Sequence, residues 1–191
     1  MLIKNEFEVA EPVDKVWQFF QNIPQVATCL PGTALTDEIG DDTYKGTVAV
    51  RMGPVRLQFA GTASITARDE AAHRLVVDAA GAEAKGRGQA SMVVTATLTK
   101  TGRGTRVDVA QDLQLSGAAA QYGRGMIADV TAVLMREFSA NLQDRIARID
   151  RGESVAELTA TPASGFMLGI RAARMALTRV FRRFFLPYQA A

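Results

Sequence analysis

The sequence has little of what redox, metal and disulfide sites require. Its 191 residues include one cysteine, Cys29, and one histidine, His73. A single cysteine excludes an intrachain disulfide, and the two residues are too few for a zinc cage of cysteines and histidines or for a site with two histidines. We therefore expect no metal site, no covalently bound cofactor, and no redox or metal catalysis by the protein itself.

Catalytic groups are also scarce. A general base or a nucleophile needs a partner that orients it. His73 falls in a turn-like stretch, as solvated surface histidines do, and Cys29 has the apolar neighbours of a small buried residue. Asp78 and Glu83 lack the spacing on a common face that would raise a pKa. The sequence predicts no catalytic residue and a protein that is not an enzyme.

No signal peptide is evident at the start of the chain. Lys4, Glu6, Glu8 and Glu11 interrupt its apolar residues, so the apolar stretch of a signal peptide is missing, and we expect the protein to remain in the cytoplasm. With 48% hydrophobic and 22% charged residues, the composition is that of a soluble globular protein with one main core.

The pattern of apolar residues predicts an α+β fold. Residues 2–9 alternate as a half-buried strand does, and two short helices follow, one beginning near Pro12 and one capped by Asn22. From residue 33 to residue 116 the chain is almost wholly strand-like, which makes about seven strands in all. Residues 121–149 then predict one long amphipathic helix, and an antiparallel sheet would wrap its apolar face around it.

Wrapping of this kind often leaves a hollow between sheet and helix. Small residues at inward strand positions, such as Gly46, Gly61 and Ala79, fit either a hollow or close packing of the helix. The candidate ligand-binding residues are inward apolar and aromatic side chains, each of which also serves as an ordinary core residue. They are Phe20, Tyr44, Val50, Phe59, Val77, Met92, Val94, Tyr122, Met126, Val130 and Leu134.

Charge divides the chain into a body and a tail. Residues 1–164 hold 17 basic and 20 acidic side chains, whereas residues 165–191 hold five arginines and no acidic side chain. We assign residues 1–150 to the folded domain and residues 151–164, which lack apolar periodicity, to a flexible linker. The acidic body disfavours nucleic acid as a partner.

Residues 165–191 predict a basic amphipathic helix, because a helical wheel separates their apolar side chains from their arginines. Five arginines along its length exclude a transmembrane span, and a helix lying on an anionic membrane surface fits better. Packing on the body or on a partner is the alternative. The candidate membrane-binding residues are Phe166, Ile170, Arg171, Arg174, Leu177, Arg179, Val180, Phe181, Arg182, Arg183, Phe184 and Phe185.

Several short motifs lie at the ends of the expected elements. They are Val13-Xaa-Xaa-Val16-Trp17, Cys29-Leu30-Pro31-Gly32, Tyr44-Lys45-Gly46, Gly53-Pro54-Val55, Gly86-Xaa-Gly88 and Gln121-Tyr122-Gly123. Together they resemble the CoxG family, named after the CoxG component of carbon monoxide dehydrogenase. This family belongs to the helix-grip (SRPBCC) superfamily of START-type lipid carriers and polyketide cyclases, and the resemblance covers about residues 1–150.

The resemblance implies a helix-grip domain, a seven-stranded antiparallel sheet wrapped around its C-terminal helix, with an apolar pocket between them. It also implies a partner, because CoxG-like proteins accompany molybdenum hydroxylases such as carbon monoxide dehydrogenase and are linked to placing that enzyme at the membrane. We predict a non-catalytic adaptor, peripheral on the inner face of the cell membrane, that carries a lipophilic ligand. A respiratory quinone is the candidate ligand. A tether without a ligand and a cyclase-like enzyme that uses Tyr44 or Tyr122 are the alternatives.

Overall fold

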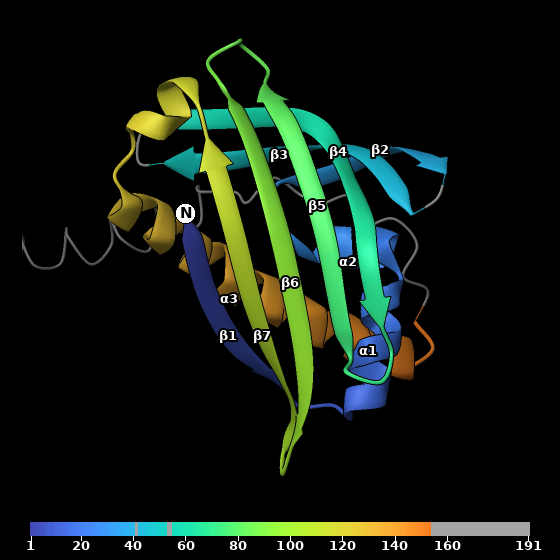
Figure 1. The fold of residues 1–191 in the computed structure, drawn as a ribbon. Helices are drawn as coiled ribbons and strands as arrows, with labels where there is room; N and C mark the ends of the chain where they lie inside the picture. The colour runs from blue at the N-terminus through green and yellow to red at the C-terminus, as the bar shows by residue number, and fades with distance from the viewer. Residues whose placement is uncertain (41, 53–54, 154–191) are drawn as a thin grey trace, which may run out of the picture. The chain divides into compact units, whose positions relative to one another are not determined.

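A seven-stranded antiparallel sheet dominates the computed structural model, which describes residues 1–40, 42–52 and 55–153 (Figure 1). The strands are β1 (Leu2–Val9), β2 (Thr33–Gly40), β3 (Thr43–Met52), β4 (Val55–Asp69), β5 (Arg74–Glu83), β6 (Gln89–Thr101) and β7 (Gly104–Leu115). Strands β2 to β7 follow one another across the sheet, and β1 crosses to pair with β7. The predicted seven strands and their antiparallel arrangement are confirmed.

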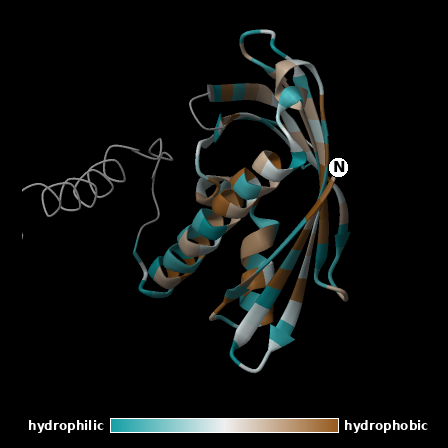
Figure 2. Cartoon of the chain, turned by 90° about the vertical axis from the view of Figure 1, so that its left-hand side faces the viewer, coloured by the Kyte–Doolittle hydropathy of each residue, from teal (hydrophilic) through white to brown (hydrophobic). Residues whose placement is uncertain are grey.

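The strand register defines an inner face of the sheet. Along one row, Ile65 lies opposite Val77, Val77 opposite Val94, Val94 opposite Gln111, and Gln111 opposite Ile3. Residues opposite each other share a face. Ile3 and Gln111 are buried, and Val77 and Val94 pack against the core, so this row lies on the inside. Figure 2 shows the sheet curving over α3 (Arg124–Asp150), which crosses this side.

Two short helices, α1 (Val13–Gln21) and α2 (Ile23–Cys29), lie on the same side of the sheet as α3 (Figure 1). Pro12 precedes α1, and the Asn22 Oδ1 atom accepts a hydrogen bond of 3.2 Å from the Gln25 N–H, which caps α2 as predicted. The apolar stripe of α1, which includes Trp17 and Phe20, is buried. Packing of this stripe explains why so short a helix is stable.

The long helix α3 begins later than residue 121, because a 3-10 turn over Gly117–Gln121 comes first. Its C-terminal half is fastened to α1 and α2. The Asn141 Nδ2 atom donates to the Cys29 carbonyl oxygen at 3.0 Å, and Lys15 forms an ion pair with Asp150. The predicted linker and amphipathic helix, apart from residues 151–153, lie outside the described residues, as do all the candidate membrane-binding side chains.

Candidate functional site

Two apolar clusters fill parts of the space between the inner face of the sheet and the helices. The larger one, which we call the α1 cluster, contains Val9, Val16, Trp17, Phe19, Phe20, Cys29, Leu75, Ala96, Leu98, Val107, Val109, Phe138, Leu142 and Ile146. The smaller one, the Ile127 cluster, contains Ile3, Leu57, Ala119 and Ile127. The α1 cluster joins α1 and α2 to the C-terminal half of α3, and the Ile127 cluster lies at the start of α3.

The candidate ligand-binding residues lie in and between these clusters. Phe20 belongs to the α1 cluster, and Val77 and Val94 pack against it. Val50, Phe59, Tyr122 and Val130 pack against the Ile127 cluster. Tyr44, Met92 and Leu134 belong to neither cluster, although Tyr44 and Met92 end one row of the inner face. The structure therefore spreads the candidate set along the inside of the domain.

Met126 is the exception among the candidates. It is 44% exposed in the first turn of α3, so the prediction that it faces the interior is wrong. That prediction assumed one helix from residue 121, with Tyr122 one turn before Met126, but Tyr122 precedes α3. Ile127, which is 5% exposed, and Val130 form the inner side of the helix here instead.

Inner-face side chains of the central strands keep accessible surface although α3 crosses this side. The partly buried ones are Phe59, Val77, Met92 and Val94. On two of the same strands, Leu57 and Leu75 are only 1% and 4% exposed. A close-packed interior would bury all of these side chains equally well. Accessible apolar surface in this position is the pattern expected beside a hollow.

Small side chains occupy the middle of this surface. Tyr44 in β3 lies opposite Ala63, Ala63 opposite Ala79, and Ala79 opposite Met92. In the next row, Gly61 lies opposite another glycine on each side. Burial and, to a smaller degree, nearby carboxylates raise the pKa of the Tyr44 phenol, so its hydroxyl stays protonated and can donate a hydrogen bond.

Two carboxamides on the inner face were missed in the sequence. Asn5 in β1 and Gln111 in β7 follow the same alternation as Ile3 and Val109, so they belong to the inner face. Gln111 is 6% exposed, and its Nε2 atom has the Met135 sulfur at 3.7 Å as its hydrogen-bond acceptor. The Asn5 Nδ2 atom is buried and has no partner among the described residues. A polar residue at an inward position of an alternating strand was the available signal.

Glu83 is a buried carboxylate that an arginine neutralises. The Arg87 guanidinium donates to Oε1 at 2.8 Å and to Oε2 at 3.2 Å, and the backbone N–H groups of Lys85 and Arg87 donate to Oε2. The hydrogen bonds from Arg87 are the main reason why the pKa of Glu83 falls to about 2. Glu83 therefore fixes the β5–β6 hairpin and stays ionised, which makes it a poor general base at neutral pH.

A shallow surface hollow lies beside this hairpin and is lined by Ala82, Gly86, Arg87, Gly88, Gln89, Ser116, Gly117 and Ala118. The Ala118 N–H donates to the Arg87 carbonyl oxygen at 2.7 Å, and a Cβ atom at Gly88 would collide with the Ser116 carbonyl oxygen. The glycines thus let two backbone segments pack closely. We assign the hollow a structural role.

The surroundings of the cysteine and the histidine are structural. Cys29 is 1% exposed, and burial raises the pKa of its thiol to about 11 despite the nearby charge of Arg145. His73 packs edge-on against Trp17 with ring centroids 5.6 Å apart, and its Nε2 atom lies 3.6 Å from Asp14 Oδ1. His73 is therefore only partly solvated, unlike the surface residue that its turn-like sequence suggested.

Two further observations concern the described part of the chain alone. It contains no group of three or more histidine, cysteine, aspartate or glutamate side chains placed to hold a metal ion. Within the same residues, no helix combines the length and apolar character that a membrane span requires.

Comparison with known proteins agrees with the fold. The model of the CoxG family of carbon monoxide dehydrogenase components matches residues 6–147. A conserved protein from Geobacillus kaustophilus is 20% identical with a TM-score of 0.69, and the match covers 78% of this chain and 96% of that one. The ZhuI aromatase/cyclase from a Streptomyces species is 13% identical with a TM-score of 0.56, over 83% and 99% of the two chains. These likenesses show a helix-grip fold. No curated protein sequence matches the chain.

Proposed function

The chain belongs to the CoxG family of carbon monoxide dehydrogenase components, and we propose that it is a non-catalytic accessory protein of a molybdenum hydroxylase such as carbon monoxide dehydrogenase. In this proposal it carries a lipophilic ligand and links the soluble enzyme to the cytoplasmic membrane. A fold hosts many functions, so the proposal rests on the site. The observation that carries it is the accessible apolar surface on the inner face of the central strands, at Phe59, Val77, Met92 and Val94.

The proposed ligand is a respiratory quinone. A dehydrogenase that oxidises a small substrate must pass the electrons to an acceptor, and a membrane quinone is an apolar acceptor of suitable character for such a surface. Ligand sites of this kind are mostly apolar and have a few placed polar groups. Tyr44, whose protonated hydroxyl can donate a hydrogen bond, is one such group beside the row of alanines.

The chemistry of the described side chains supports a carrier over an enzyme. The charge of Glu83 is used by Arg87, the Cys29 thiol is buried with a pKa of about 11, and His73 packs on Trp17. None of these three arrangements pairs a nucleophile with a general base. The likeness to an aromatase/cyclase is too distant to bring an activity with it.

Membrane attachment is assigned to residues 165–191. Their five arginines would each contribute about 1 kcal/mol on an anionic leaflet, and their phenylalanines would add apolar contact with the lipid. A net charge of −3 on residues 1–164 would disfavour attachment through the body itself.

The test compares the full chain with a chain that ends at Ser164. Both are floated with anionic and with neutral vesicles, alone and with the dehydrogenase, and their organic extracts are analysed by mass spectrometry. We expect the full chain to bring the dehydrogenase to anionic vesicles, the shortened chain to fail, and both to contain a quinone. Equal vesicle binding by the two chains would refute the membrane role. Extracts without lipophilic molecules, together with no uptake of added quinone, would refute the carrier role.

A further inference from the structure

The carboxamides of Asn5 and Gln111 have donor groups that the protein leaves without an oxygen acceptor. The Asn5 Nδ2 atom is buried and has no partner among the described residues, and the Gln111 Nε2 atom has a thioether sulfur at 3.7 Å. Sulfur is a weak acceptor, and buried polar groups in proteins almost always have a good partner. Two neighbouring exceptions on one face therefore indicate that the acceptor comes from elsewhere.

Both carboxamides lie beside the accessible apolar surface. Gln111 is directly opposite Val94, which is only partly buried. Asn5 lies diagonally across the β1–β7 pair from Gln111, because the direct partner of Gln111 is Ile3. On the helix side, Met135 contacts Gln111. The two donors thus form a polar end to an otherwise apolar row.

We propose that Asn5 and Gln111 donate hydrogen bonds to the carbonyl oxygen of the carried ligand and so select ligands that have one. This inference rests on the proposed function and names the chemistry that its site recognises. A carbonyl oxygen has two lone pairs and can accept from both carboxamides. A hydrocarbon of the same shape leaves both donors unpaired and binds less tightly. Because both donors are uncharged, a neutral carbonyl suits them better than a carboxylate.

The experiment measures binding of three probes to the full chain by calorimetry in detergent. They are an alkyl benzoquinone, a fatty-acyl methyl ester and an alkylbenzene without oxygen, all of the same chain length. The first two separate the possible sources of the carbonyl group. We expect at least one of them to bind about tenfold more tightly than the alkylbenzene, a ratio that corresponds to the loss of one or two ordinary hydrogen bonds.

Asn5→Leu and Gln111→Leu test the donors, and Gln114→Leu, an exposed residue on the opposite face of β7, is the matched control. We expect the first two variants to reduce the preference for the carbonyl probe severalfold with little loss of alkylbenzene binding, and the control to keep it. As a measurement that needs no substitution, the side-chain amide resonances of Asn5 and Gln111 should shift when the carbonyl probe binds and not when the alkylbenzene does.

Three outcomes would overturn the inference. If all three probes bind the natural chain equally, the carrier function stands but the carboxamides select nothing. If a carbonyl preference survives in both leucine variants and the two amide resonances do not respond, another group makes the contact. If no probe binds, the carrier function fails and this inference fails with it.

Discussion

At the residue scale, Glu83 links the pH of the solution to the stability of the β5–β6 hairpin. Hydrogen bonds from Arg87 lower the pKa of Glu83 from an ordinary value of 4.5 to about 2 in the folded protein. A lowered pKa means that Glu83 stabilises the fold fully above about pH 4.5, and that this contribution disappears as the pH falls toward 2. Glu83→Gln should therefore destabilise the protein at pH 7, and the difference from the natural protein should shrink below pH 4.5.

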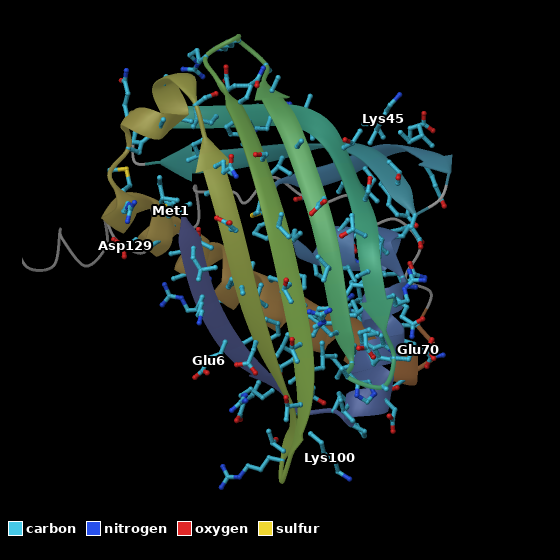
Figure 3. All side chains as sticks on the ribbon, in the orientation of Figure 1. Met1, Glu6, Lys45, Glu70, Lys100 and Asp129 are labelled. Atoms are coloured by element: carbon cyan, nitrogen blue, oxygen red, sulfur yellow. The ribbon has the colours of Figure 1, made fainter. Side chains whose placement is uncertain are left out.

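Urea unfolding at a series of pH values measures this difference. Glu6→Gln is the matched control, because Glu6 is exposed on β1 and extends away from the sheet (Figure 3). We expect the control to follow the natural protein at every pH. A constant difference between Glu83→Gln and the natural protein from pH 7 down to pH 2 would show that the Glu83 charge is not what stabilises the hairpin.

At the scale of strands, Gly61 shows why the middle of the sheet needs glycine. A Cβ atom there would collide with the Ala80 carbonyl oxygen, and its register partners in β3 and β5 are Gly46 and Gly81. Gly61→Ala should therefore lower the free energy of unfolding by about 2–4 kcal/mol, since backbone must move to accept the methyl group. Chemical denaturation measures the loss.

Gly102→Ala provides the control for this prediction. Gly102 lies in the turn between β6 and β7, where an added Cβ atom meets nothing within 4 Å. We expect that substitution to change stability by less than about 0.5 kcal/mol, as is usual for open surface positions. If the two alanine variants were equally stable, the close approach of β4 and β5 at Gly61 would not exist in solution.

The sequence was enough to predict the elements because their periodicity is strong. The alternation in β3 and β4 and the apolar spacing in α3 survive in the structure almost residue for residue. The start of α3 was not predictable in the same way, since the helical spacing of Tyr122 and Met126 continues through a 3-10 turn. Periodicity reports which side of an element is apolar, but it does not report where the backbone changes from one helix type to another.

The candidate site was predicted only in its apolar part. Phe59, Met92 and Val94 follow from alternation alone, because every second residue of a strand faces inward. Asn5 and Gln111 occupy the same phase, but a polar residue in that phase reads as an interruption until the register shows that both face α3. Their importance depends on missing partners, which only a three-dimensional structure can reveal.

At the scale of the whole chain, the division between an acidic body and a basic tail separates two tasks. A carrier that must release its ligand to a partner gains if the same surface does not hold both membrane and ligand. The described domain, with its inner face, would carry the ligand, and residues 165–191 would supply the attraction to anionic lipid. Binding to vesicles should then depend on the tail arginines and on salt, and not on the basic residues of the body.

Replacing Arg179, Arg182 and Arg183 with glutamine tests this division in the full chain. At about 1 kcal/mol for each arginine, the triple variant should bind anionic vesicles roughly 100-fold more weakly. The control replaces Lys85, Lys100 and Arg103, three exposed basic residues of the body, of which Lys100 extends from the β6–β7 turn in Figure 3. Because both variants lose the same charge, a general effect of net charge would weaken them equally and contradict the prediction. Cosedimentation in increasing salt completes the test, since screening should remove the difference between the natural chain and the tail variant.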